Sequence, residues 1–489
     1  MNACIKQSFL LPALMAGLAL MLAGQARAQT FTTLYSFSAD IYPTYTNSNG
    51  ALPAAGLFLS GDTLYGAAQY GGIDGTGTVF ALNTDDMSFT NLHTLTYSDA
   101  SDPVTALILS DGILYGTAPF GGSGRDGAVF SVQINGGPYA AVHNFTPFSG
   151  SGGTFGTNGD GGFCYGALIL SGNTLYGTAF DGGSLGQGTV FAVNTDSTDF
   201  RNLHSFTGDS NGACPYAGLI LSGDTLYGTT SSGFIPTEQS GFGTVFAINT
   251  NGSDFTTLYS FTNGSDGSQP FGGLILSGSA LYGTAYAGGL SGFGTVFALN
   301  TNGSNFTTLY SFTNGSDGSM PWAGLILSGN TLYGTANRGG DAGNGTVFSV
   351  NTNGSNFTTL HGFTTAISDG ISAYPSYTNS DGYYPLDQLI LSSNTLYGTA
   401  QNGGVFGSGT IFSISLPSVG APQLAITAAG TNVILTWPTN DAGFTLQSAT
   451  NLGSSAVWTT NSPAPVLISG QFTVTNSVTG SQMFYRLSQ

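Results

Sequence analysis

The chain has 489 residues and very few cations: six lysines and arginines stand against 24 aspartates and glutamates, for a formal net charge of −18. So few positive side chains cannot neutralise phosphates, which excludes nucleic-acid binding and disfavours contact with anionic lipids. The 76 glycines, 34 phenylalanines and 23 tyrosines favour short strands joined by tight turns, so we expect an all-β fold.

Residues 1–28 have the features of a secretory signal peptide. Lys6 supplies the positive start, an apolar run extends from Phe9 to Gly24, and Ala26, Arg27 and Ala28 fit the small-residue cleavage rule. This run of about sixteen residues is short for a membrane span, and no later apolar stretch is long enough to cross a bilayer. We therefore expect cleavage after Ala28 and a secreted or cell-surface protein with no transmembrane segment in its mature chain.

An internal repeat dominates the rest of the sequence. Its marker is Leu-Tyr-Gly, which recurs at intervals of 50 to 64 residues. The seven marker tyrosines are Tyr65, Tyr115, Tyr176, Tyr227, Tyr282, Tyr333 and Tyr397. Each copy holds four strand-like pieces, for example 255–262, 273–277, 281–285 and 294–299. Four short strands per about fifty residues are typical of one blade of a β-propeller.

The phase of the repeat predicts a closed ring. The array opens with a lone outer-type strand at 31–37 and ends with an inner three-strand set at 388–414. Pairing the first piece with the last removes two exposed strand edges. The loops beside this seam also match, because 42–49 resembles 374–381. We therefore expect residues 29–416 to form a seven-bladed β-propeller and the protein to be a monomer.

The register changes after Leu416. Pro417, Gly420 and Pro422 mark a linker over 417–422. Residues 423–489 then contain several strand-like pieces, which favour a small β-sandwich of immunoglobulin or fibronectin type III character. We expect Trp437 and Trp458 to be its core aromatic residues.

One copy of the repeat identifies a family. Residues 317–364 read DGSMPWAGLILSGNTLYGTANRGGDAGNGTVFSVNTNGSNFTTLHGFT. This pattern resembles the choice-of-anchor tandem-repeat GloVer family, and the resemblance covers about 31–416. It implies an exported bacterial repeat protein of unassigned activity, with attachment segments that differ between members. This chain departs from anchored members because it has no C-terminal membrane helix or basic tail.

The four histidines, His93, His143, His204 and His361, occupy one position of the repeat. The other copies have Tyr35, Tyr259 and Tyr310 there. Equivalent positions lie around a ring and cannot converge on one metal or one nucleophile. We therefore predict no metal site, no cofactor and no catalytic histidine.

Asp266, Asp317 and Asp381 recur before the inner strands, each followed by glycine. Such aspartates usually cap a turn through their own backbone, which is the interpretation we favour. The alternative is a ring of acids on one face, which could bind calcium or serve a glycosidase.

Aromatic residues are the candidate binding residues. Tyr165, Tyr216, Phe271 and Trp322 are equivalent in four consecutive copies, where they could pack between blades or stack on sugar rings. The variable loops between the second and third strands should lie on the same face, and binding usually resides in such loops. From them we add Arg125, Arg338, Tyr70, Phe120, Phe180, Phe234 and Tyr286.

Cys164 and Cys214 lie one position out of register in adjacent copies. A disulfide between them would join the third blade to the fourth if their Cα atoms lie within about 7 Å. An even pair of cysteines in an exported chain is compatible with that bridge.

These features favour a non-catalytic exported protein that binds a carbohydrate or another surface ligand, or that serves as a scaffold. Two alternatives remain open: a polysaccharide lyase or hydrolase that uses carboxylates on the propeller face, and a purely structural or adhesive envelope protein.

Overall fold

A computed structural model gives the fold of the chain. The structure describes residues 29–39, 46–149, 156–232, 241–368, 377–417, 424–429, 432–438, 445–449, 458–460, 464–468, 471–477 and 484–488. Every regular element in these ranges is a β-strand, as the composition predicts. None of the described residues belongs to a helix that could span a membrane. The expected signal peptide at 1–28 and nearly all of the expected linker at 417–422 lie outside the described residues.

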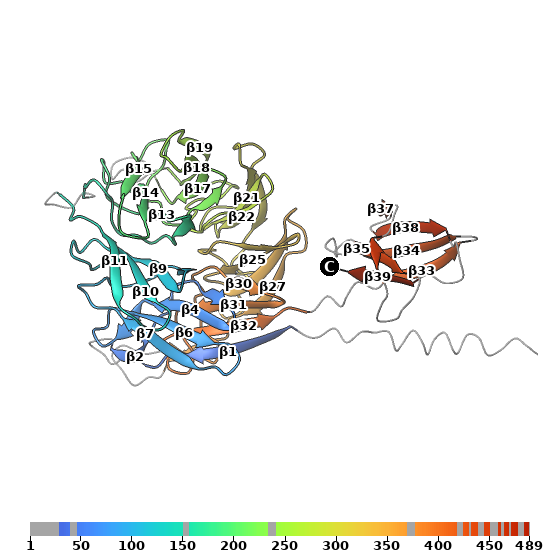
Figure 1. Ribbon diagram of the computed structural model, residues 1–489, viewed down its shortest axis with the longest axis horizontal. Helices are drawn as coiled ribbons and strands as arrows, with labels where there is room; N and C mark the ends of the chain where they lie inside the picture. Colours follow the sequence, from blue (N-terminus) through green and yellow to red (C-terminus); the bar gives the residue numbers. More distant parts are fainter. Residues whose placement is uncertain are drawn as a thin grey trace, which may run out of the picture. The chain divides into compact units, whose positions relative to one another are not determined.

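Thr30–Ser415 form one compact unit that contains, among its described residues, seven four-stranded antiparallel sheets (Figure 1). Six of them follow the chain in order. These are β3 (Phe58–Ser60), β4 (Thr63–Ala68), β6 (Thr78–Asn83) and β7 (Phe89–Thr94); β8 (Ile108–Ser110), β9 (Ile113–Ala118), β10 (Ala128–Gln133) and β11 (Tyr139–Asn144); β12 (Ile169–Ser171), β13 (Thr174–Ala179), β14 (Thr189–Asn194) and β15 (Arg201–Ser205); β16 (Ile220–Ser222), β17 (Thr225–Thr230), β18 (Thr244–Asn249) and β19 (Thr256–Ser260); β20 (Ile275–Ser277), β21 (Ala280–Ala285), β22 (Thr295–Asn300) and β23 (Thr307–Ser311); and β24 (Ile326–Ser328), β25 (Thr331–Ala336), β26 (Thr346–Asn351) and β27 (Thr358–Gly362).

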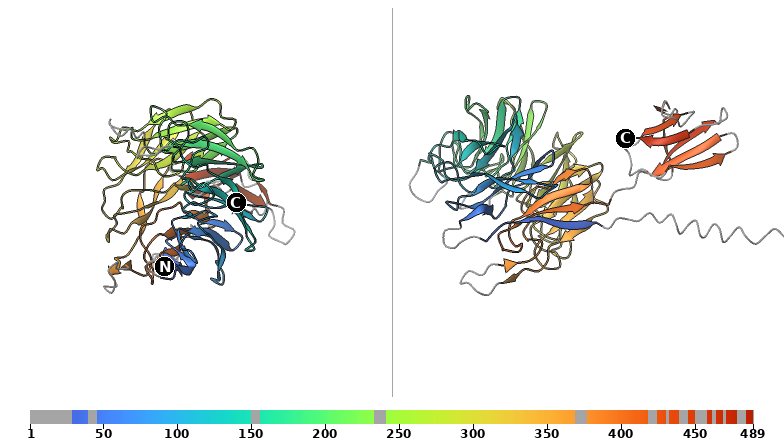
Figure 2. Two further views of the ribbon diagram at one scale, coloured as in Figure 1. Left: turned by 90° about the vertical axis from the view of Figure 1, so that its left-hand side faces the viewer. Right: turned by 60° about the horizontal axis from the view of Figure 1, so that its bottom comes forward.

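The seventh sheet joins the two ends of the array. Its order is β1 (Thr30–Ser36), β32 (Thr410–Ser415), β31 (Thr395–Ala400) and β30 (Ile390–Ser392). Strand β1 pairs antiparallel with β32, so that Phe31 lies opposite Ile414. Figure 2 shows the blue strand β1 beside the orange strands of this last sheet. The pairing of the first strand with the last three, predicted from the phase of the repeat, is confirmed.

Steric contacts explain why glycine recurs in the Leu-Tyr-Gly marker. In the fifth copy, Gly283 of β21 lies opposite Phe297 of β22. A Cβ atom at Gly283 would lie 2.6 Å from Cζ of the Phe297 ring, which is fully buried. The equivalent glycine and phenylalanine face each other in every copy. The glycine of Leu-Tyr-Gly therefore leaves room for a fully buried phenylalanine ring in each sheet.

Aromatic stacking links the outer strands. The histidine or tyrosine at one repeat position stacks on an aromatic ring of the next outer strand. That ring lies four residues before the histidine or tyrosine of the next copy. The described residues form seven such stacks, with ring centroids 3.7 to 5.3 Å apart: Tyr35–Phe89, His93–Tyr139, His143–Phe200, His204–Phe255, Tyr259–Phe306, Tyr310–Phe357 and His361–Phe31. The series returns to the strand on which it began. We call these stacks the outer belt.

The loops contain two short two-stranded sheets. Strand β2 (Asn47–Ala51) pairs with β5 (Tyr70–Gly72), and β28 (Ile367–Ser368) pairs with β29 (Tyr377–Thr378).

Residues 416–489 belong to a second compact unit. One sheet has the order β33 (Ala425–Ala429), β34 (Asn432–Pro438), β38 (Gln471–Ser477) and β37 (Val466–Ile468), and the other β36 (Thr459–Thr460), β35 (Thr445–Ala449) and β39 (Phe484–Ser488). Trp437 is buried with Leu435, Leu446 and Val474, as expected of a core residue. Trp458 differs from the expectation, because it is only partly buried and its ring lies 4.3 Å beneath the Arg486 guanidinium.

Candidate functional site: a central cavity

Two sets of loops meet at one end of the seven sheets. Residues before an inner strand pair with residues after the second strand of the same sheet, as in Gly162 with Asp181, Ser268 with Ala287, and Ser319 with Arg338. These bridges put the two loop sets on one face, as the sequence predicts. We call it the loop face.

A left-handed residue fixes the entry to each inner strand. Met320 is an example: its φ is +55°, its N–H donates to the Phe293 carbonyl of the preceding copy, and its carbonyl accepts from Asn337. A positive φ is unusual for residues other than glycine. Every copy nevertheless has one here: Leu52, Asp102, Phe163, Cys214, Gln269, Met320 and Tyr384. The candidate aromatic position follows two residues later, so the backbone of neighbouring copies sets its place.

A cavity of about 530 Å³ lies among the inner strands and is lined by residues from all seven copies. Most of its wall consists of alanines, glycines and the leucines and isoleucines of the inner strands. We call it the central cavity. Its volume is within the range of small-molecule pockets.

Aromatic rings cover one part of this wall. Tyr165 and Tyr216 stack with their centroids 4.8 Å apart, and Phe271 and Trp322 stack at 4.3 Å. Tyr216 and Trp322 meet edge to face at 5.4 Å, which joins the two pairs. The four equivalent residues proposed from the sequence therefore form one cluster, and all four line the central cavity.

Other candidate aromatics extend the cluster. Phe180 lies edge-on to Tyr165 at 5.6 Å, and Tyr286 lies edge-on to Trp322 at 5.2 Å. Phe120 reaches the cluster only through Tyr165, at 6.5 Å. Phe180 and Tyr286 directly follow their second strands, where they support the rings that line the cavity.

Among the described residues, the candidates Arg125, Tyr70 and Arg338 do not line the central cavity. Arg125 is exposed in its loop, and the backbone of Tyr70 pairs with Ala51. The Arg338 guanidinium lies 4.1 Å from the Tyr384 ring, and its Nη1 donates to the Tyr384 hydroxyl at 2.7 Å. Phe234 lies outside the described residues.

A polar part of the wall was not foreseen. Asp387, Gln388, Gln69 and Gln401 line the cavity. At the position of Asp387 the other six copies have small residues: Ala55, Thr105, Gly166, Ala217, Gly272 and Ala323. This single departure from the repeat is the sequence signal that could have found the site.

Asp387 is held by backbone groups from two copies. One carboxylate oxygen accepts the Gly56 N–H and the other accepts the Gln388 N–H at 2.6 Å. Burial raises the pKa of Asp387 to about 7, although both hydrogen bonds favour the ionised form. The Gln388 amide nitrogen donates to the Leu325 carbonyl, and the Gln401 amide nitrogen donates to Gln69 Oε1 at 3.3 Å.

Comparison with known families identifies the repeat. The sequence profile of the Gloeobacter/Verrucomicrobia repeat matches residues 22–167, 153–313 and 239–436. The chain belongs to the Gloeobacter/Verrucomicrobia repeat family. This match confirms the family resemblance carried by residues 317–364. Comparison with curated protein sequences gave no match.

Several solved structures are similar to this Gloeobacter/Verrucomicrobia repeat protein but share little sequence with it. An oligogalacturonate lyase from Vibrio parahaemolyticus is 13% identical, with 80% of this chain and 98% of the other covered and a TM-score of 0.48. A putative 6-phosphogluconolactonase from Bacteroides fragilis is 16% identical, with 69% and 95% covered and a TM-score of 0.43. A puromycin-hydrolysing peptidase from Mycobacterium tuberculosis is 12% identical, with 82% and 62% covered and a TM-score of 0.44.

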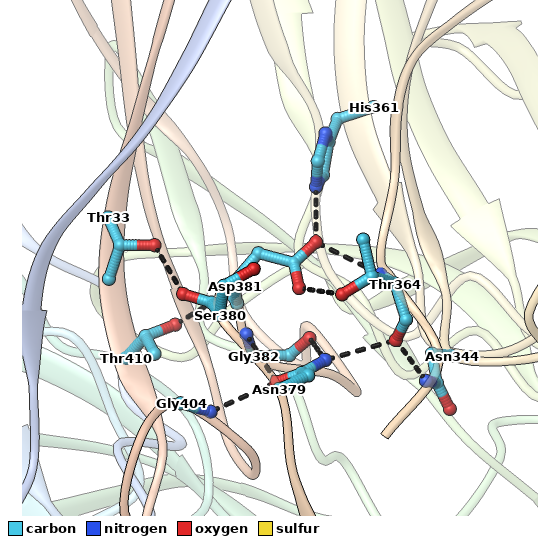
Figure 3. A network of polar contacts seen from close by, with 10 residues as sticks. All are labelled: Thr33, Asn344, His361, Thr364, Asn379, Ser380, Asp381, Gly382, Gly404 and Thr410. Carbon is cyan, nitrogen blue, oxygen red and sulfur yellow. Dashed lines mark hydrogen bonds and ion pairs between the residues drawn. The ribbon is translucent and has the colours of Figure 1, made fainter. Parts of the chain in front are cut away.

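The histidines and recurrent aspartates of the Gloeobacter/Verrucomicrobia repeat have local structural roles. His361 Nε2 lies 2.9 Å from Asp381 Oδ2, which also accepts the Thr364 N–H at 2.9 Å (Figure 3). Tyr259 takes the place of the histidine beside Asp266. Burial opposes ionisation of Asp381, but the His361 and Thr364 hydrogen bonds outweigh it and lower the pKa of Asp381.

This arrangement supports the turn-capping interpretation over a ring of acids. Asp266 and Asp317 bind the threonine N–H groups of Thr262 and Thr313 in the same way. The described residues include no group of three or more histidine, cysteine, aspartate or glutamate side chains that could hold a metal ion.

The two cysteines of the repeat array are free thiols, so the disulfide considered from the sequence is absent from the structure. Cys164 occupies a position where the other copies have proline, and its side chain packs with Phe145 and Leu168. Burial raises the pKa of the Cys164 thiol well above its ordinary value, and burial raises that of Cys214 to about 12.

Proposed function

We propose that this protein is an exported, closed seven-bladed β-propeller that binds a carbohydrate in its central cavity and does not turn it over. The observation that carries the proposal is the composition of the cavity wall. The seven copies have closely similar cores, but they contribute different side chains to the cavity wall. One part of the wall is aromatic and another part is polar.

Contacts at the seam support closure of the ring. The N–H of Leu52 in the first copy donates to the carbonyl of Ser408 in the last copy at 2.8 Å. His361 and Phe31 complete the outer belt at a centroid distance of 3.8 Å. All seven copies line one cavity, as expected if the cavity lies on the axis of a closed ring. A closed ring would leave no unpaired strand edge at either end of the array.

The two parts of the wall suit a sugar. Aromatic side chains pack against the C–H faces of pyranose rings, while carboxylates and amides bind their hydroxyl groups. Trp322 and Tyr216 supply the first kind of group, and Asp387 and Gln401 supply the second. A wall of alanine and glycine elsewhere leaves space for the ring itself.

Turnover of a polysaccharide is the competing function, and the raised pKa of Asp387 is the observation in its favour. A carboxylic acid that is partly protonated near neutral pH can act as a general acid. Hydrolysis of a glycoside, however, generally needs two carboxyl groups about 5 to 9.5 Å apart. Asp387 is the only acid among the described residues that line the cavity, so the geometry favours binding.

Export and attachment belong to the same proposal. Residues 1–28 would direct secretion and be removed after Ala28. The two sheets of residues 424–488 would form an immunoglobulin-like or fibronectin-like sandwich that serves as a spacer or attachment module, joined through the linker at 417–422. Arg125 and Tyr70 on the loop face would contact longer ligands outside the cavity.

A glycan array probed with the purified mature protein tests binding, and a reducing-end assay on each bound glycan tests turnover. The proposal predicts binding without release of reducing ends or unsaturated products. Steady product release would establish an enzyme instead. Failure to bind any glycan, together with retention of the protein in the envelope fraction, would favour the structural or adhesive alternative.

A further inference from the structure

We propose that the central cavity selects a sugar that carries a positively charged amine, with Asp387 as the counter-ion of that amine. This inference rests on the proposed function, because it names the class of carbohydrate that the same cavity would take.

The charge of the wall is the first argument. Asp387 is the only charged side chain among the described lining residues, and no lysine or arginine is among them. Arg338, on the loop face, is engaged with Tyr384. A cavity whose single charge is negative, in a chain with a net charge of −18, attracts cations and repels anions such as uronic acids.

The aromatic cluster is the second argument. The faces of tryptophan, tyrosine and phenylalanine rings carry negative potential and attract ammonium groups, and tryptophan is the most effective. Trp322, Tyr216 and Tyr165 line the same cavity as Asp387. An ammonium ion gains from both the aromatic rings and the carboxylate, whereas a neutral hydroxyl group gains the hydrogen bond to the carboxylate but no cation–π attraction.

Hydrogen-bonding capacity is the third argument. An ammonium group donates three hydrogen bonds and accepts none. The amide nitrogens of Gln388 and Gln401 each use one of their two hydrogens within the protein. Asp387 accepts two backbone N–H groups, but a carboxylate has about four acceptor positions, so it can accept from a ligand as well. The polar part of the wall therefore offers acceptors to an amine.

Titration calorimetry with three sugars of one ring shape tests the inference: glucosamine, N-acetylglucosamine and glucose. Choline is added as a cation that is not a sugar. The measurement is made at about pH 7.5, above the pKa of about 7 for Asp387. The other titratable lining groups, Tyr165 and Tyr216, stay neutral there because burial raises the pKa of each further from this pH.

We expect glucosamine to bind at least about tenfold more tightly than N-acetylglucosamine or glucose. Asp387→Asn should remove this preference, so that glucosamine and glucose then bind the variant with similar affinity. If Asp387→Asn does not fold, Gln401→Lys provides the second variant, because a lysine in the polar part of the wall would neutralise Asp387 and abolish the preference.

The outcomes separate the two proposals. Equal affinity for the three sugars would overturn the amine inference and leave carbohydrate binding intact. Binding of choline that depends on Asp387, without binding of any sugar, would support amine recognition and overturn the carbohydrate proposal. Binding of none of the four compounds would overturn the amine inference, and the glycan array would then decide the proposed function by itself.

Discussion

Asp387 and Gly56 are 331 residues apart in the sequence, yet the Asp387 carboxylate accepts the backbone N–H of Gly56. This bond connects the last copy of the repeat to the first and holds the only charged side chain among the described residues that line the central cavity. The seam and the candidate site therefore share a residue, so a change at either partner should affect both stability and binding.

Asp387→Asn should change how stability depends on pH. The folded-state pKa of about 7 lies above the ordinary value of 3.8, so the native state holds a proton that the unfolded state releases. The stabilising effect of this proton is complete below about pH 4 and is lost as the pH rises through 7. Between about pH 4 and pH 8 the wild type should lose about 2 to 4 kcal/mol relative to the variant. Urea unfolding of both proteins at the two pH values measures this, and parallel curves for the two proteins would contradict it.

Gly56→Ala should destabilise the seam. A Cβ atom there would lie 3.1 Å from the Ala106 Cβ atom and 3.2 Å from the Asp387 carboxyl carbon, which is closer than side chains normally pack. We expect a loss of about 1 to 2 kcal/mol in the free energy of unfolding. Gly273 occupies the equivalent position of the fifth copy, where a Cβ atom would have no neighbour nearer than 3.9 Å. Gly273→Ala is therefore the matched control, and an equal loss in both variants would show that the seam is not specially packed.

Asp381→Asn tests the turn-capping role of the recurrent aspartates. The pKa of Asp381 is below 3.8 in the folded state, so its ionised form stabilises the protein above that pH and ceases to do so as the pH falls through the folded-state value. We expect the variant to be less stable by about 1 to 2 kcal/mol at neutral pH and to approach the wild type as the pH falls through the folded-state pKa of Asp381. The fourth copy has Asn211 beside His204, so asparagine fits the site. A deficit that persists unchanged in acid would contradict the role of the charge.

Cys164 and Cys214 should be unreactive in the native protein. Both thiols are buried, and burial raises the pKa of each, so little thiolate is available to react. Titration with a thiol reagent should label neither residue of the mature protein under native conditions and both after denaturation without reductant. Absence of labelling in the denatured, unreduced protein would indicate a disulfide.

The sequence could predict what the repeat itself encodes. The spacing of Leu-Tyr-Gly gives the strands, and the phase of the first and last copies gives the pairing of β1 with β32. The cluster of Tyr165, Tyr216, Phe271 and Trp322 follows from their equivalent positions. The position of each residue after its second strand explains why Phe180 and Tyr286 contact the cluster. Both directly follow that strand, whereas Tyr70 lies one position further along its loop.

What could not be predicted depends on contacts between distant copies. The environment of Asp387 includes Gly56, which no local spacing relates to it. The cysteines are near each other in register, but Cys164 takes the place of a proline and its side chain enters the core. The Arg338 guanidinium is held by Tyr384 of the next copy, which is 46 residues away in the sequence.

Trp322 gives the most direct test of carbohydrate binding in the central cavity. The affinity of the mature protein for its best glycan should be compared with the affinities of Trp322→Ala and Trp322→Phe. Phenylalanine is the residue at the equivalent position of the fifth copy, Phe271. We predict that Trp322→Ala weakens binding about tenfold or more and that Trp322→Phe retains most of it. Unchanged affinity in Trp322→Ala, with the variant folded, would contradict a binding site in this cavity.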